Sequence, residues 1–326
     1  MRRLLVLAVT LAVAATLLFW PSSPPPPLRH IHIGGLPTLT MADMRPHLEA
    51  FERFALENEG NRGHGSVAYS KSVEYVAGKL AAAGFQLTRQ EFGWQREHSV
   101  NLIADWPGGD ESDVLMVGAH LDSVAAGPGI NDNGSGSAAI LALALAVAAK
   151  HHRPARHLRF AWWGTEELGL IGSKHYVRAL TPQASAAIAG YLNLDMIASP
   201  NGGHFIYDSD DSNRSGQGPG APGSELIEQA LTAYFSSVDV PLYEVDFDGR
   251  SDYAPFLSAG IPVGGLLTGT SEIKPQSMAD MWGGTAGQPF DPCYHQACDT
   301  NANINETIYL RNANAAAHAF WTLSTR

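Results

Sequence analysis

Apolar and polar residues alternate along most of the chain with the spacings typical of strands and helices. Helical spacing is expected over 41–59, 70–84, 134–150, 170–180, 225–235 and 304–323. Short apolar runs predict strands at 100–104, 114–118, 158–163, 188–195, 204–207, 242–245 and 263–267. Strands that alternate with helices predict a single α/β domain, with a central mixed, mostly parallel sheet covered by helices on both faces.

The N-terminus is typical of an export signal. Met1, Arg2 and Arg3 precede an uncharged run over residues 4–20, and a Pro-rich stretch follows at once. Two interpretations stay open: residues 1–20 are a cleaved signal peptide, or 4–20 remain as a membrane tether. We therefore expect an exported chain, secreted or periplasmic or anchored. Its organisation would be a signal or anchor (1–20), a Pro-rich spacer (21–40) and a catalytic domain (41–326).

Composition narrows the class of protein. The chain has 326 residues, 45% of them hydrophobic, which suits one large domain. Its formal net charge is -11 and it has no long Lys/Arg cluster, so we do not expect a nucleic-acid partner.

His120 ends an apolar run, and a glycine-rich turn then presents Asp132 before a long apolar helix. Such strand ends are where sites assemble in open α/β sheets. Asp122, two residues after the histidine, can accept the second ring N–H of His120 and fix its tautomer. By itself the pattern is better explained as a loop with local hydrogen bonds.

Two further runs also end in carboxylates. Glu166 and Glu167 follow the run at 158–163, and Asp195 ends the run at 188–195. Neighbouring side chains point in different directions, so one glutamate can face a metal while the other faces substrate. Taken alone, the paired glutamates are better explained by a helix N-terminus, and Asp195 by an ordinary acidic strand end.

The only two cysteines, Cys293 and Cys298, flank His295. Export favours a disulfide that folds this short segment back and holds His295 in place. Two thiolate zinc ligands are disfavoured, because the chain has no further cysteine to complete such a site. Free thiols remain the alternative.

Together the five residues have the chemistry of a metal centre. Two histidines with three carboxylates suit zinc, and a shared carboxylate suits a pair of ions. In this order the motifs resemble the secreted bacterial double-zinc aminopeptidases, leucyl-type enzymes with a zinc aminopeptidase, phosphorylase/hydrolase-like fold. The motifs that carry the resemblance are Gly-Ala-His-Leu-Asp-Ser, Asn-Asp-Asn-Gly-Ser-Gly, Glu-Glu-Leu-Gly-Leu-Ile-Gly-Ser, Asn-Leu-Asp-Met-Ile and Cys-Tyr-His, and the match spans roughly residues 45–325.

The resemblance implies a role for each residue. His120 and Asp195 would bind one zinc, Glu167 and His295 the other, and Asp132 would bridge them. Glu166 would act as general base on a zinc-bridging water, and Tyr294 would steady the oxyanion.

The resemblance also implies a substrate. Arg250 would position a peptide or protein N-terminus, from which the enzyme removes the first residue. Met196, Gly249 and Leu267 would line an apolar pocket that suits leucine-like or larger first residues. We expect a monomer.

The chain also differs from the aminopeptidase family at one expected calcium site. Some relatives bind calcium through two acids near the C-terminal helix, where this chain has Glu306 but then Leu310, which counts against calcium dependence. The alternatives are a carboxypeptidase or a one-zinc glutaminyl cyclase on the same scaffold, a non-catalytic module and a tethered structural protein. All five ligands and Glu166 are present, which disfavours the non-catalytic module.

Overall fold

The computed structural model describes residues 37–216 and 218–325. The expected signal or anchor, and the spacer up to residue 36, lie outside the described residues. Leu39 is buried, and its backbone N–H and C=O bond the side chain of Asn314. The folded body therefore begins no later than Leu39.

An eight-stranded sheet forms the centre of the described part, in the order β1-β2-β4-β3-β5-β8-β6-β7. Its strands are β1 (Gln86–Trp94), β2 (Glu97–Asp105), β3 (Asp110–His120), β4 (Arg156–Trp163), β5 (Ile188–Leu194), β6 (Phe205–Tyr207), β7 (Tyr243–Val245) and β8 (Val263–Leu267). The middle strands β4, β3, β5 and β8 run parallel to one another. On the two sides of this group, β2 is antiparallel to β4 and β6 is antiparallel to β8, and β1 and β2 form an antiparallel hairpin. The predicted mixed, mostly parallel α/β sheet is confirmed.

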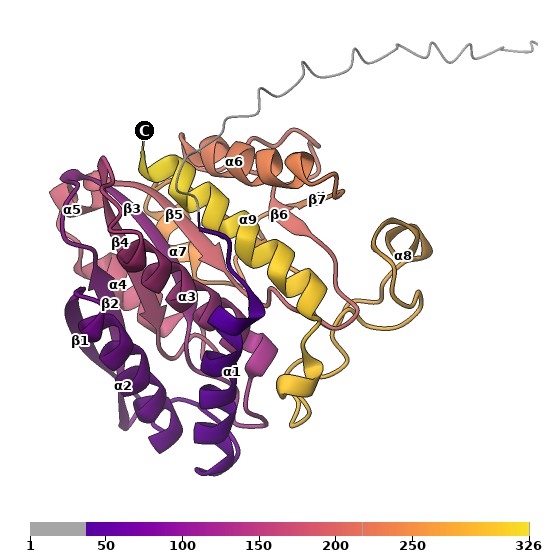
Figure 1. Cartoon of the computed structure of the whole chain (residues 1–326), viewed down its shortest axis with the longest axis horizontal. Helices are drawn as coiled ribbons and strands as arrows, with labels where there is room; N and C mark the ends of the chain where they lie inside the picture. The colour runs from indigo at the N-terminus through magenta and orange to yellow at the C-terminus, as the bar shows by residue number, and fades with distance from the viewer. Residues whose placement is uncertain (1–36, 217, 326) are drawn as a thin grey trace, which may run out of the picture. The chain divides into compact units, whose positions relative to one another are not determined.

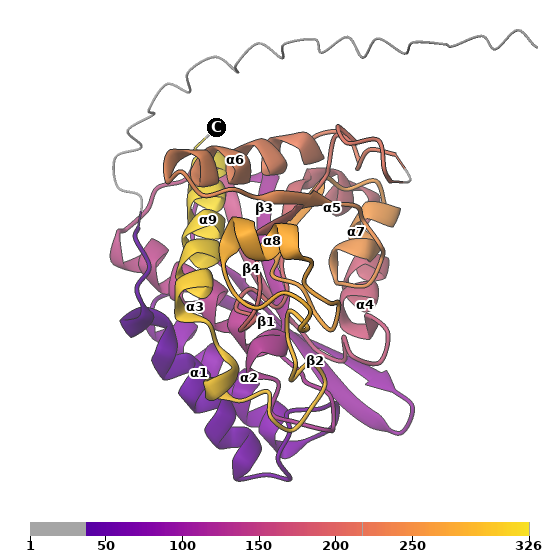
Figure 2. The same ribbon diagram turned by 90° about the vertical axis from the view of Figure 1, so that its right-hand side faces the viewer.

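Helices cover both faces of this sheet (Figures 1 and 2). The α-helices are α1 (Met41–Leu56), α2 (Val67–Ala82), α3 (Gly136–Ala149), α4 (Ile171–Ala179), α5 (Pro182–Ala187), α6 (Ser224–Ser237), α7 (Tyr253–Ser258), α8 (Gln276–Trp282) and α9 (Glu306–Ser324). In Figure 2, α1, α3 and α9 lie on one side of the strands and α4 and α7 on the other. The sheet is therefore the middle layer of three.

Strand β3 shows why both faces must be covered. Leu115 and Val117 belong to the core beneath α3 and α9, whereas Val114 and Met116 belong to the core beneath α4 and α7. Because successive side chains of a strand point to opposite faces, a strand that is apolar at every position is stable only between two layers. The uninterrupted apolar run at 114–118 therefore reflects burial of both faces of β3.

The stretch Ile130–Ala149, which contains α3, is long and apolar enough to cross a membrane, with a mean hydropathy of 1.3. It is nevertheless 83% buried inside the domain. Alanines along α3 and α9 let the two helices pack closely over the sheet. Its apolar character is therefore explained by the core.

Four elements have no counterpart in the prediction: β1, α5, α7 and α8. β1 is the outer strand of a hairpin, and most of its residues are at least partly exposed, so it lacks the apolar run that identified the inner strands. The three helices span six or seven residues, too few to show a helical period.

A buried histidine makes the stability of this fold dependent on pH. His204 is 1% exposed, and its Nδ1 lies 2.9 Å from Oδ1 of Asn312 on α9. Burial lowers its pKa from 6.5 to about 4, so the unfolded chain takes up a proton first as the pH falls. The stabilisation is complete above pH 6.5 and is lost as the pH falls toward 4, at about 1.4 kcal/mol per pH unit.

Urea unfolding of the wild type and of His204→Phe, at about pH 7 and about pH 5, tests this expectation. The free energy of unfolding should fall less between the two pH values in the variant. Equal decreases in both proteins would show that His204 does not contribute.

Candidate metal centre

Three neighbouring strands bring their carboxyl ends to one edge of the sheet. β3 ends at His120, β4 ends three residues before Glu166, and β5 ends one residue before Asp195. Because the three strands are parallel, their ends meet. His120, Glu166, Glu167 and Asp195 all line one cavity of about 580 Å³ at this edge.

The carboxylate of Asp132 lies at the centre of the cluster. Its Oδ1 is 3.2 Å from Nε2 of His120, and its Oδ2 is 3.1 Å from Nε2 of His295. On the His120 side, Nε2 is 3.4 Å from Oδ1 of Asp195. On the His295 side, Nε2 is 3.0 Å from Oε2 of Glu167. The five predicted ligands thus form two groups that share Asp132.

These five side chains fit a pair of zinc ions. Ligand atoms of one tetrahedral zinc ion, each about 2.0–2.1 Å from the metal, lie about 3.3 Å from one another, close to the observed separations. Oε1 of Glu167 and Oδ1 of Asp195 are buried and have no hydrogen-bond partner within the described residues. Buried oxygens without donors are costly unless a cation coordinates them.

The electrostatics of the bare cluster also indicate missing positive charge. Burial, together with the charge of Asp132, raises the pKa of Glu167 to about 7. Burial lowers the pKa of His295, but Asp132 and Glu167 outweigh it and raise the value to about 10. Without metal, the two histidines would therefore be protonated, and their positive charge would partly balance the carboxylates.

Glu166 lies beside the His120 group, and one of its oxygens is within 4.8 Å of ligand atoms of both His120 and Asp195. It is 8% exposed, and its Oε2 is 3.9 Å from Nε2 of His120. Burial raises its pKa well above the ordinary value; His120 opposes this shift, and Asp252 and Asp195 add to it. No hydrogen bond to its carboxylate is present within the described residues, which leaves a carboxylate able to move a proton.

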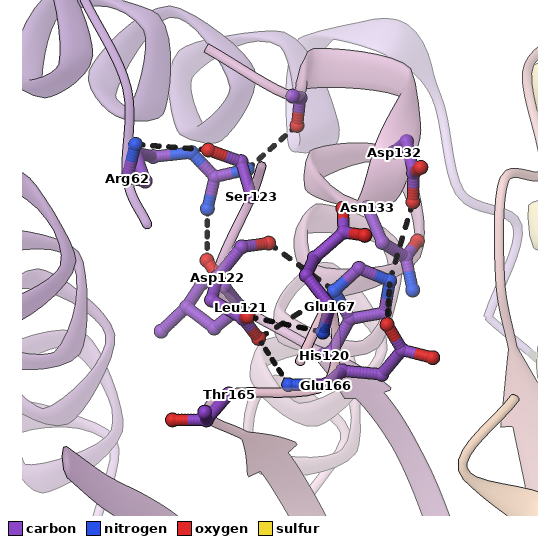
Figure 3. A network of polar contacts seen from close by, with 12 residues as sticks. Arg62, His120, Leu121, Asp122, Ser123, Asp132, Asn133, Thr165, Glu166 and Glu167 are labelled. Carbon is purple, nitrogen blue, oxygen red and sulfur yellow. Dashed lines mark hydrogen bonds and ion pairs between the residues drawn. The ribbon is translucent and has the colours of Figure 1, made fainter. Parts of the chain in front are cut away.

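Asp122 holds the turn that carries both glutamates (Figure 3). Its carboxylate accepts the backbone N–H of Glu166 at 3.0 Å and of Glu167 at 3.4 Å. The same carboxylate also faces His120, as expected, but as an ion-pair contact rather than a hydrogen bond: Oδ1 is 3.7 Å from Nδ1, and the backbone carbonyl of Asp122 lies closer, at 3.1 Å. The hydrogen bonds of the carboxylate are directed toward the 166–167 turn.

Arg62 fixes the loop between His120 and Asp132, as Figure 3 shows in part. Its guanidinium is fully buried and donates to the carbonyls of Leu121, Pro128 and Gly129. Burial lowers its pKa to about 10, still well above neutral, so it stays charged. One side chain therefore sets the path of the loop.

The segment with His295 is closed by the Cys293–Cys298 disulfide, which confirms the favoured pairing. Asp299 follows directly, and its carboxylate accepts the backbone N–H of Asn131 at 2.8 Å and of Asp132 at 3.0 Å. This carboxylate ties the disulfide loop to the turn that presents Asp132, so the two loops position their ligands together.

The predicted substrate residues lie around the same cavity. Its lining includes Met196, Gly249, Arg250, Leu267 and Tyr294. The ring of Tyr294 stacks on that of His295, with centroids 3.8 Å apart. The structure therefore brings every predicted ligand, Glu166 and these five residues to one site, with Asp122 directly behind it.

Ser251 and Asp299 are contributors that the sequence did not single out. Oγ of Ser251 donates to Oδ2 of Asp195 at 2.5 Å and accepts from Nδ2 of Asn193. Ser251 lies inside the span 45–325 of the family resemblance, but neither its spacing nor the composition around it identifies it as a functional residue. Only the folded chain places it against a ligand.

The comparisons with known proteins agree with this geometry. The profile described as Peptidase family M28 matches residues 101–320, more than half of the chain. The chain is 49% identical over 288 residues to leupeptin-inactivating enzyme 1 of Streptomyces exfoliatus, a match that covers 88% of this chain and 63% of that protein. It is 47% identical over 234 residues to an aminopeptidase of Pseudomonas aeruginosa, covering 71% of this chain and 43% of that one.

The structure also superimposes on a zinc aminopeptidase of Bacillus subtilis with a TM-score of 0.72. That match covers 89% of this chain and 96% of the other at 16% identity, and so shows a shared fold. The chain belongs to peptidase family M28. It spans 63% or less of the length of the two curated relatives described above.

The position of Asp122 predicts a measurable loss of metal affinity. Asp122→Ala removes the acceptor of two backbone N–H groups, which frees the 166–167 turn. Supporting residues of this kind typically change metal affinity by about 10- to 100-fold. Competitive zinc titration against a chelator should show this loss, and Asp113→Ala, a change of the same type at a distant exposed carboxylate, should show none.

The disulfide predicts a selective effect on the His295 group. In Cys293→Ser/Cys298→Ser, His295 is no longer held by a closed loop, so zinc binding that depends on the His295 group should weaken while binding at the His120 group is kept. Isothermal titration with zinc separates binding at the two groups. Unchanged zinc binding would show that Asp299 alone holds the loop.

Proposed function

We propose that this chain is an exported zinc aminopeptidase that removes single residues from the free N-terminus of peptides. One observation carries the proposal: Asp132 directs its two oxygens toward two groups of ligands while Glu166, close by, remains free. His120 and Asp195 would hold one zinc ion, His295 and Glu167 the other, with Asp132 between them.

Two zinc ions would supply a water of lowered pKa and polarise the scissile carbonyl. Glu166 takes the proton of the attacking water on a carboxylate oxygen and returns it to the departing amine. The hydroxyl of Tyr294 donates to the developing oxyanion, and Arg250 orients the substrate. Ser251 and Asp122 keep Asp195 and the 166–167 turn in place during these transfers.

The preference for a free amino end is supported by charge. The cavity lining is rich in carboxylates, and Asp246, Asp248 and Glu272 lie there in addition to Glu166 and the ligands. A protonated α-amine is attracted to such a surface. The relatives named as aminopeptidases support the same direction of cleavage.

The wall around Met196 and Leu267 supports an apolar first residue. Phe205, Tyr207 and Val245 line the same cavity. Apolar walls of this kind favour leucine-like side chains, because their burial contributes about 0.8 kcal/mol per methylene.

The other parts of the proposal concern the whole chain. Residues 1–20 direct export and are either cleaved or kept as a tether through 4–20, and 41–326 form the catalytic domain. The disulfide supports export, because such bonds persist in oxidising compartments. We propose a monomer without calcium dependence. Light scattering of the purified chain tests the first point, and activity with added calcium after calcium removal tests the second.

Metal removal and counting test the two-zinc proposal. Dialysis against a chelator should abolish the stepwise loss of N-terminal residues from defined peptides, as read by mass spectrometry, and zinc should restore it. Elemental analysis should give two zinc ions per chain. One ion per chain with formation of pyroglutamate from N-terminal glutamine would indicate a cyclase, and trimming from the carboxyl end a carboxypeptidase.

Glu166→Gln tests the proton transfer separately from metal binding. The amide cannot accept the proton, so kcat should fall by about 100- to 10,000-fold. The zinc content should stay unchanged, because glutamine keeps the shape of the side chain and the five proposed ligands remain in place. Activity close to that of the wild type would contradict the role of general base.

A further inference from the structure

A hairpin leaves β8 and forms one wall of the cavity. Residues 270–274 pair with residues 287–291, and α8 lies between these two arms. Backbone N–H groups of Lys274, Phe290 and Asp291 donate to the carbonyls of Gln288, Glu272 and Thr270, at 2.9, 2.9 and 2.7 Å. The two arms are therefore joined by hydrogen bonds around one antiparallel bridge, between Ile273 and Pro289.

The outer edge of this hairpin is unpaired. Thr270, Glu272 and Lys274 use their backbone groups inside the hairpin, so Ser271 and Ile273 point theirs to the opposite side. No hydrogen-bond partner for the backbone of Ser271 or Ile273 is found in the part of the chain that the structure describes. Both residues are exposed, Ile273 by 58%. Free edges of this type pair readily with another extended chain.

The edge is continuous with the proposed substrate cavity. Thr270, Glu272 and Phe290, from the same hairpin, line the cavity. Extended chain rises about 3.3 Å per residue, and the bend at Ser271 and Glu272 shortens the path, so Ile273 lies within about 10 Å of Thr270. An extended peptide whose first residue fills the cavity covers this distance with the three or four residues after the scissile bond.

The edge is also held rigidly. Lys274 is 1% exposed, and its Nζ donates to the carbonyls of Asn201 and Gly202 at 3.0 and 2.9 Å. Beyond it, the indole N–H of Trp282 donates to the carbonyl of Pro241 at 2.7 Å. A preorganised edge loses little entropy when a peptide binds.

We propose that residues 271–273 bind the backbone of the substrate beyond the scissile bond, as an added β-strand. This inference rests on the proposed aminopeptidase function. Recognition through main-chain groups does not depend on the side chains of the substrate. It would let one site hold peptides of many sequences while the cavity selects the first residue.

Peptides of graded length test the inference on the zinc-loaded full chain. kcat/KM should rise about tenfold from Leu-Ala-amide to a Leu-Ala-Ala-Ala-Ala-amide peptide, as two main-chain hydrogen bonds would give. N-methylation of single amides at the third to fifth residues should abolish the gain at one or two positions. A gain that survives methylation at every position, or the absence of any gain, overturns the proposal.

Two substitutions at one position separate backbone from side-chain recognition. Ile273→Pro removes an N–H that has no partner in the hairpin, and should abolish the gain with length. Ile273→Ala keeps the N–H and should retain the gain. Loss of the gain in both variants would assign recognition to the apolar side chain and overturn the proposal.

Cleavage of leucine 4-nitroanilide serves as the reference, because it has no residues beyond the scissile bond. Both variants should cleave it as the wild type does, which also shows that they are folded. If the wild type releases no N-terminal residue from any substrate, the proposed function itself fails. If it cleaves short and long substrates equally, only the added strand is refuted.

Discussion

The structure depends on a concentration of buried carboxylates at one edge of the sheet. Asp132, Glu167 and Asp195 converge there with Glu166, and Asp252 is fully buried next to them with neither oxygen hydrogen-bonded within the described residues. So much like charge away from water is tolerated only with compensating cations. Two histidines cannot supply this compensation and remain neutral ligands. Divalent cations can supply it, which favours a metal centre over a set of ion pairs.

Holding such a cluster requires loops as fixed as strands. Thr165, Met196 and His295 adopt positive φ angles of 62°, 49° and 57°, each at a predicted ligand or within two residues of one. For residues other than glycine this conformation costs about 1–3 kcal/mol, and it persists only where contacts with the surrounding structure hold it. Two contacts hold these conformations. The carboxylate of Asp122 accepts a backbone N–H from the turn after Thr165, and the disulfide closes the loop around His295. The strain thus lies where the ligands must be aimed.

Much of this arrangement follows from the sequence, because strand ends are local features. The apolar runs before His120, Glu166 and Asp195 predicted both the parallel sheet and the edge at which these residues meet. The partners of the ligands could not be found in this way. Ser251 contacts Asp195 across 56 residues and Asp299 contacts Asp132 across 167, and no periodicity records such contacts. The carboxylate of Asp122 was assigned to His120 because sequence distance favours it, whereas the fold directs its hydrogen bonds to the 166–167 turn.

The balance of charge explains how one centre could serve both hydrolysis and the choice of a free amino end. Two divalent ions would outweigh the three ligand carboxylates by one charge, and with Glu166 and the buried Asp252 beside them the centre itself would carry little net charge. What remains around the cavity is Asp246, Asp248 and Glu272 against Lys174 and Arg250. This acidic surplus lies outside the ligand set and belongs to the walls of the substrate cavity. Attraction of a protonated amine is therefore a property of the walls, and it can vary among relatives that keep the same metal centre.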